Sequence, residues 1–169
     1  MKHANMGFGK GFTLAELLAV VIILSILTAI GAGTYKKAIE RSRFNDALNI
    51  ATTIQEAVDR YTYENNGATT TNKKQLDIAF ENMQECSTPA DNCIQTNYFV
   101  VTINGSSTVA QRRTGLYQAR VYSEVVGSNT RKEPTCAGYL EEGKNFCVSV
   151  GYGGGCSQSG DWHVCEKTF

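Results

Sequence analysis

Residues 11–33 read GFTLAELLAVVIILSILTAIGAG, and this stretch decides the architecture of the chain. Its apolar run from Phe12 to Ile30 is interrupted by only four polar residues, which are Thr13, Glu16, Ser25 and Thr28. A helix of about 19 residues is roughly 28 Å long, which is enough to cross a hydrocarbon core. A secretory signal peptide typically ends in an A-x-A-like cleavage site, and no such site follows this run. The pattern therefore predicts a retained transmembrane helix over residues 12–33.

The helical pattern continues beyond the apolar run. Apolar residues recur at spacings of mostly three and four, at Ile39, Phe44, Ala47, Leu48, Ala51, Ile54, Val58 and Tyr61. No proline lies between Phe12 and Glu64, and Asn65-Asn66-Gly67 is typical of a helix end. A separate amphipathic helix on the membrane surface is the alternative interpretation. Direct continuity with the apolar run favours a single helix on the order of 80 Å long, whose amphipathic part covers residues 34–66.

The remaining residues, 67–169, have the pattern of a small globular domain. Three segments are β-like: Tyr98–Asn104, Tyr117–Val126 and Phe146–Tyr152. The second alternates residue by residue, as expected for a sheet with one covered face. Residues 74–84 could form one or two helical turns, and the glycine-rich segment from Tyr152 onwards is predicted to be irregular. The predicted fold class is α+β, with the long helix packed against a small antiparallel sheet.

Six cysteines all lie in the second half of the chain, at Cys86, Cys93, Cys136, Cys147, Cys156 and Cys165. An even number without a CxxC spacing indicates disulfide bonds, and these form in an oxidising compartment. Six reduced thiols in a cytoplasmic core are the alternative. Six cysteines allow 15 pairings. The short separations lead to the hypothesis that sequential neighbours pair, as Cys86–Cys93, Cys136–Cys147 and Cys156–Cys165.

The orientation of the helix follows from two opposing signals. Lysines at 2 and 10 precede the apolar run, whereas Lys36, Lys37, Arg41 and Arg43 follow it. The positive-inside rule alone would place the C-terminal half in the cytoplasm. The cysteines indicate the opposite, and six cytosolic thiols would need a separate explanation. We therefore predict that residues 67–169 form a head outside the cytoplasm.

The composition argues against several classes of function. The chain has 16 basic and 16 acidic residues and no basic run, so no nucleic-acid partner is expected. His163 is the only histidine after Gly11, and the chain has no GxSxG, HExxH or Walker A motif. The three glycines at 153–155 precede no helix-forming stretch, so no phosphate cradle is expected there. The sequence predicts a non-enzymatic protein with no cofactor and no metal site.

The N-terminal motif resembles a known family. Lys10 and Gly11, followed by Phe12, Thr13, Leu14 and Glu16, resemble the class III signal of type IV prepilins and type II secretion pseudopilins. In that family a short basic leader ends in glycine, phenylalanine follows, and a glutamate stands at the fifth position of the hydrophobic helix. An ordinary signal anchor, whose glutamate reaches the membrane interface, is the alternative.

The resemblance implies a processing pathway and a set of partners. Prepilin peptidase would remove residues 1–11 by cleavage between Gly11 and Phe12, and Phe12 would then be N-methylated. Residues 12–33 would form the core of a filament assembled by an inner-membrane platform and its ATPase. The head would be periplasmic before assembly and lie on an extracellular fibre afterwards.

The resemblance also assigns roles to residues of the helix. The amine at Phe12 would meet Glu16 of a neighbouring subunit, which would offset part of the cost of a carboxylate in lipid. Many pilins have a kinking proline near the end of the apolar run, where this chain has Gly31 and Gly33. Each glycine lowers helix stability by about 1 kcal/mol relative to alanine, so the helix is expected to loosen there on assembly.

A pilus subunit is favoured over a pseudopilin for two reasons. Pilin heads more often carry C-terminal disulfides, and no clustered Asp/Asn loop typical of a calcium site is present. A pseudopilin is the first alternative. A membrane-anchored, disulfide-rich binding domain that does not polymerise is the second.

Overall fold

The computed structural model describes residues 11–81, 83–86, 90–124 and 133–168. The chain divides into two compact units, residues 1–40 and residues 41–169. One helix, α1 (Leu14–Glu64), begins in the first unit and ends in the second. Its 51 residues confirm the long helix predicted from the sequence.

The end of α1 has the expected glycine cap. Asn66 and Gly67 both adopt positive φ angles, of 54° and 88°, and the Gly67 N–H donates to the Thr62 carbonyl at 2.9 Å. The left-handed conformation lets the Gly67 N–H bond to a helix carbonyl that would otherwise be unpaired, and it turns the chain away from the helix axis. Glycine is the residue that adopts such a conformation at the lowest cost.

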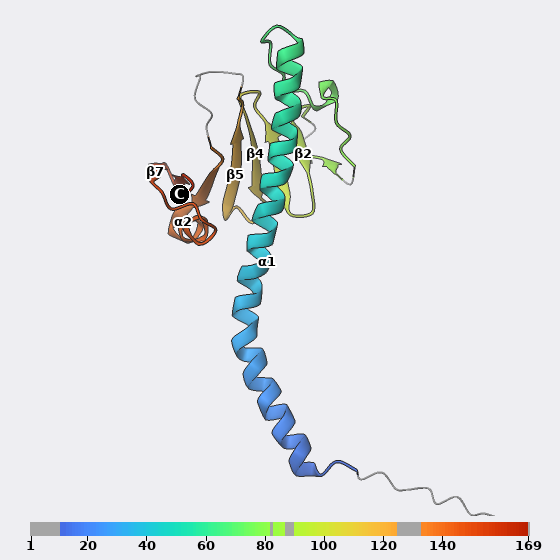
Figure 1. Cartoon of the computed structure of the whole chain (residues 1–169), viewed down its shortest axis with the longest axis vertical. Helices are drawn as coiled ribbons and strands as arrows, with labels where there is room; N and C mark the ends of the chain where they lie inside the picture. The colour runs from blue at the N-terminus through green and yellow to red at the C-terminus, as the bar shows by residue number, and fades with distance from the viewer. Residues whose placement is uncertain (1–10, 82, 87–89, 125–132, 169) are drawn as a thin grey trace, which may run out of the picture. The chain divides into compact units, whose positions relative to one another are not determined.

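The second unit contains an eight-stranded antiparallel sheet (Figure 1). The strands are β1 (Gln84–Glu85), β2 (Cys93–Gln95), β3 (Phe99–Ile103), β4 (Ser107–Arg112), β5 (Tyr117–Tyr122), β6 (Thr135–Tyr139), β7 (Cys156–Ser159) and β8 (Trp162–Cys165). Their order is β1-β2-β3-β4-β5-β6-β8-β7, so only the last two exchange places. A short 3₁₀ helix, η1 (Lys73–Gln75), follows α1, and α2 (Leu140–Ser149) follows β6 directly. The structure confirms the α+β fold class.

Several local predictions are corrected. Residues 146–149 belong to α2 rather than to a strand, because Gly143 and Cys147 bury one face of that helix at helical spacing. The tail from Tyr152 is not wholly irregular: β7 and β8 form a hairpin in which Gly160 turns the chain with a φ of 60°. Within residues 74–81 and 83–84, the end of η1 is the only helical part.

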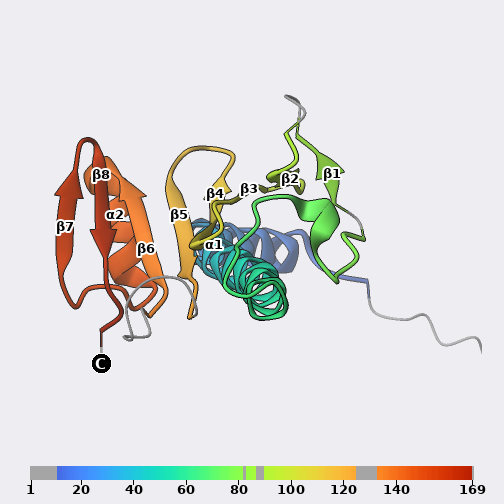
Figure 2. The same ribbon diagram turned by 90° about the horizontal axis from the view of Figure 1, so that it is seen from above.

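Both helices pack against the same side of the sheet through aromatic rings. Phe44 of α1 makes edge contacts with Tyr117, Phe146 and Tyr152 at centroid distances of 5.4–5.9 Å. The Tyr117 ring on β5 also stacks on Phe146 of α2 at 4.2 Å. Figure 2 shows α1 along the sheet near β4 and β5, and α2 beside β6 and β8. The core therefore lies where the two helices meet β5.

A buried polar network ties α1 to the sheet. Gln55 donates to the Gly105 carbonyl at 3.1 Å and accepts from the Thr108 hydroxyl at 3.0 Å. The Asp59 carboxylate, 9% exposed, accepts hydrogen bonds from Gln55, the Ser123 hydroxyl and the Glu124 N–H. Buried polar groups are stable only when they are hydrogen-bonded, so this network fixes how the helix lies on the sheet.

A surface ion pair adds a second tie at the same helix. Arg60 binds Asp77 through two hydrogen bonds of 2.8 and 2.7 Å. The Arg60 guanidinium holds the pKa of the Asp77 carboxyl below its ordinary value, chiefly through these hydrogen bonds. Both side chains are about half exposed, at 47% and 58%, so the pair contributes little to stability but orders the loop after α1.

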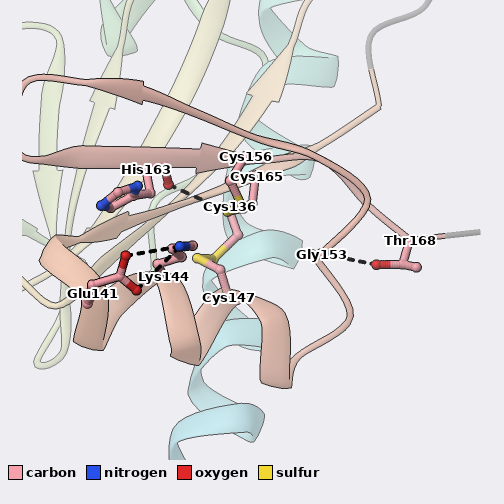
Figure 3. The surroundings of a disulfide bond; sticks show 9 residues. All are labelled: Cys136, Glu141, Lys144, Cys147, Gly153, Cys156, His163, Cys165 and Thr168. Carbon is pink, nitrogen blue, oxygen red and sulfur yellow. Dashed lines mark hydrogen bonds and ion pairs between the residues drawn. A yellow bond between two sulfur atoms is a disulfide. The ribbon is translucent and has the colours of Figure 1, made fainter.

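Three disulfides join Cys86 to Cys93, Cys136 to Cys147, and Cys156 to Cys165, as expected from the short separations. Figure 3 shows the second bond fastening α2 to β6, and the third crossing the β7–β8 hairpin. Beside them, the Gly153 N–H donates to the Thr168 hydroxyl at 2.8 Å and holds the last described residues against the preceding loop. Each bridge closes a short loop, which contributes roughly 2–3 kcal/mol on the chain-entropy estimate.

Two glycines allow β6 and α2 to approach closely, and this contact gives a first prediction. A Cβ atom on Gly138 would lie 2.0 Å from the Gly143 carbonyl carbon, which is backbone and cannot rotate away. Gly138→Ala should therefore destabilise the head by about 3 kcal/mol or more, because overpacking must separate β6 from α2. Urea denaturation of the full chain in detergent measures the change.

Gly155→Ala is the matched control for this substitution. No atom lies within 4 Å of a Cβ added at Gly155, and its φ angle is not in the left-handed region. We expect the control to change the denaturation midpoint very little. Equal stability of the two variants would contradict the assigned close packing.

Candidate assembly site on the N-terminal helix

The apolar part of α1 exposes its side chains on every side. Leu14, Leu17, Ile22, Ile26 and Ile30 are each more than half exposed. The helix reaches a mean hydropathy of 2.5 over 18 residues, and none of that window is buried by the rest of the chain. Among the described residues this is the one helix long and apolar enough to span a membrane. So large an apolar surface requires lipid or other protein chains around it.

The polar side chains within this run bond to their own helix. The Ser25 hydroxyl donates to the Val21 carbonyl at 2.6 Å, and the Thr28 hydroxyl donates to the Leu24 carbonyl at 2.6 Å. Hydroxyls bonded in this way need no partner from water. The helix can therefore lie in an apolar environment without unsatisfied hydroxyl groups.

Thr13 and Glu16 form a capping box at the start of α1. The Glu16 N–H donates to the Thr13 hydroxyl at 3.2 Å, and the Thr13 N–H donates to the Glu16 carboxylate at 2.8 Å. The Thr13 hydroxyl also donates to that carboxylate at 2.9 Å. The first N–H groups of a helix have no partner within it, and this reciprocal pair satisfies two of them.

The capping box gives Glu16 a second role, beside the pairing with a neighbouring subunit that the sequence predicts. The spacing Thr-x-x-Glu before an apolar run is the sequence signature of such a box, so the signal was present in residues 13–16. Both hydrogen bonds from Thr13 end on the same oxygen, Oε2. Within the described residues, Oε1 accepts no hydrogen bond, so that oxygen can accept one from another molecule.

The predicted processing site lies just before the helix. Gly11, Phe12 and Thr13 are not helical, and the Phe12 side chain is 83% exposed. Phe12 is therefore an accessible residue four positions before Glu16. Residues 1–10 of the predicted leader lie outside the described residues.

Gly31 and Gly33 lie within a continuous helix. A Cβ atom added to either glycine would meet nothing within 4 Å, so no contact inside the chain requires them. The Thr34 hydroxyl donates to the Gly31 carbonyl at 2.9 Å in this region. Loosening of the helix here on assembly stays a prediction.

The structure thus gathers Phe12, Thr13 and Glu16 at one end of the apolar helix, while the six cysteines lie in the head. Among known proteins, a segment of this chain is similar to fimbrial protein EcpC of Eikenella corrodens, with 42% identity over 52 residues. The match covers 31% of this chain and 34% of that protein. No family model and no solved structure matches the chain.

The fold and the partial match support a pilin-like class of protein. The long apolar helix is consistent with membrane anchoring, and the fimbrial relative is consistent with self-assembly into a fibre. That relative also favours a structural role over an enzymatic one.

Proposed function

We propose that this chain is a structural subunit of a type IV pilus-like fibre, which polymerises through the apolar part of α1. The observation that carries the proposal is the apolar surface of residues 14–30, which no other part of the chain covers and which follows directly on Phe12 and the Thr13–Glu16 box. Packing this surface against copies of itself would remove it from lipid while keeping each hydroxyl satisfied within its own helix.

In this proposal, prepilin peptidase cleaves between Gly11 and Phe12, and Phe12 becomes the N-methylated first residue. The chain then has a single membrane pass, with its head in the periplasm and its disulfides formed there. An inner-membrane platform and its ATPase extract the subunit and add it to the fibre.

Removal of the leader creates a cationic amine at Phe12, close to the apolar region. In the fibre, this amine is the partner for the Glu16 carboxylate of a neighbouring subunit. The capping box supports this role because it orients the carboxylate and leaves Oε1 as an acceptor. Two opposite charges brought together offset part of the cost of placing each in an apolar setting.

Mass spectrometry of the mature N-terminus, combined with isolation of sheared fibres, tests the proposal. We expect a chain that begins at methylated Phe12, and we expect this chain in the sheared fraction. A chain that keeps Met1 and stays in the membrane would instead support an anchored binding domain. A methylated chain that forms no surface fibre, and whose loss blocks secretion, would support a pseudopilin.

A further inference from the structure

The charges of α1 beyond its apolar run are separated by sign along the helix. Residues 34–45 contain four basic residues and one acidic residue, for a net charge of +3. Residues 46–64 contain one basic residue and four acidic residues, for a net charge of −3. The charged residues, in order, are Lys36, Lys37, Glu40, Arg41, Arg43, Asp46, Glu56, Asp59, Arg60 and Glu64.

The charge at the end of α1 does not serve the stability of the helix itself. The macrodipole of a helix favours acidic residues in its first turn and basic residues in its last turn. In α1 the last turn contains Glu64 and no basic residue. Lys37, Arg41 and Glu56 lie too far from either end of the helix to be affected.

Four exposed residues of the two regions form no ion pair within the described part of the chain. Lys37 and Arg41 belong to the basic region, and Glu56 and Glu64 belong to the acidic region. The nearby Arg60 is held by Asp77 through two hydrogen bonds, and its charge also attracts Glu56 and Glu64, each four positions away, without forming an ion pair with either. The two opposite patches thus remain for charges on another molecule.

The members of each patch lie close together along α1. Lys37 and Arg41 are four positions apart, which is about one turn of an α-helix, and Glu56 and Glu64 are eight positions apart, which is a little over two turns. Glu56 and Glu64 are exposed, so the sheet of their own chain does not cover them.

We infer that the acidic patch of one subunit, Glu56 and Glu64, docks on the basic patch, Lys37 and Arg41, of a second copy of this chain. The inference rests on the proposed function and adds an axial register to it. Glu56 lies 19 positions after Lys37, and Glu64 lies 23 positions after Arg41. At 1.5 Å per residue, two parallel helices pair both patches when they are offset by about 30 Å.

Reciprocal charge reversal in the full chain tests the inference. Cells that carry the export and assembly apparatus would produce Lys37→Glu with Arg41→Glu, Glu56→Lys with Glu64→Lys, or all four changes together. Like charges in register are strongly unfavourable, so we expect each double variant to lower the fibre yield per processed subunit at least about tenfold. The fourfold variant should recover to within about threefold of the unaltered chain.

Arg113→Glu with Lys167→Glu is the matched control, since both residues are exposed and lie outside the patches. This variant should assemble normally. The processed membrane pool is measured in parallel. Replacing Lys37 and Arg41 removes basic residues from the non-cytoplasmic flank, so it should not impair membrane insertion. A thiol assay confirms that all variants contain the three disulfides.

A photo-crosslinking residue at position 41 measures the register directly. In assembled fibres it should link to the peptide containing residues 56–64 of another copy. Unchanged fibre yield in either double variant, failure of the fourfold variant to recover, or a crosslink to a different region would overturn the inference. Absence of fibres from the unaltered, processed chain would instead contradict the proposed function and remove the inference with it.

Discussion

Glu16→Ala should reduce fibre yield by at least about a hundredfold while the chain still inserts and is cleaved. Removing one partner of a buried charge pair costs roughly 2–5 kcal/mol at each contact, mainly because the other charge is left unpaired. In the single subunit, the same substitution removes a carboxylate that is costly in lipid, by about 2.5–3.5 kcal/mol at a helix centre and less near an interface. The yield of sheared fibre relative to the processed membrane pool is the measurement.

Two further variants separate the charge of Glu16 from its capping role. Glu16→Gln keeps the acceptor that a capping box needs but removes the charge, so it should assemble nearly as poorly as Glu16→Ala. Thr13→Ala removes the capping hydroxyl that bonds to Glu16 and keeps the carboxylate. It should cost about 1 kcal/mol of helix stability and retain much of the assembly.

Thr13→Ser is the control for these variants, because serine supplies the same hydroxyl to the box. Normal fibre from Glu16→Ala would show that the carboxylate is not needed between subunits, and the pairing with the Phe12 amine would be abandoned. Assembly lost equally in Glu16→Ala and Thr13→Ala, but kept in Glu16→Gln, would assign the effect to helix capping alone.

Phe44→Ala should destabilise the head by about 3–5 kcal/mol, the usual cost of removing a buried phenylalanine. Phe44 is 1% exposed and contacts one aromatic ring on β5, one on α2 and one in the following loop, at Tyr117, Phe146 and Tyr152. Its loss would leave a cavity where both helices meet the sheet. Urea denaturation of the detergent-solubilised chain, followed by near-ultraviolet circular dichroism, measures the effect.

Tyr63→Ala is the matched control on the same helix. The Tyr63 side chain is 70% exposed, so its removal should change the free energy of unfolding by no more than about 0.5 kcal/mol. If Phe44→Ala were as mild as Tyr63→Ala, the aromatic cluster would not be the centre of the core. Both variants should retain their three disulfides, because each bond joins two cysteines that are close in the sequence.

The sequence predicts those features whose cause is local or strongly periodic. The apolar run, the stripe that includes Phe44 and Ile54, and the glycine at 67 are enough to predict α1 and its end. The strand from Tyr117 was also predicted, because its residues alternate between the two faces of the sheet. Short separations led to the correct pairing of the cysteines.

The features that sequence reasoning missed depend on contacts between distant segments. Phe146, Val148 and Val150 alternate as they would in a strand, yet residues 140–149 form a helix in which Cys147 reaches Cys136. The strand β8 lies between β6 and β7, an order that no local pattern specifies. At the candidate site, the spacing of Thr13 and Glu16 is a local signal of the capping box, whereas the charge of Glu16 alone indicates only a pairing between subunits.

If the chain assembles into a fibre as proposed, the positions of its disulfides have a mechanical consequence. All three bonds lie after residue 85, and α1 contains no cysteine. Apart from the backbone that continues from the end of α1, a tensile load applied through α1 would therefore reach the sheet through noncovalent contacts, chiefly the ring of Phe44 and the hydrogen bonds of Gln55 and Asp59. Under load, these noncovalent contacts would break before any covalent bond is strained. An overstretched fibre would slide its helices along the heads while each head keeps its crosslinked loops.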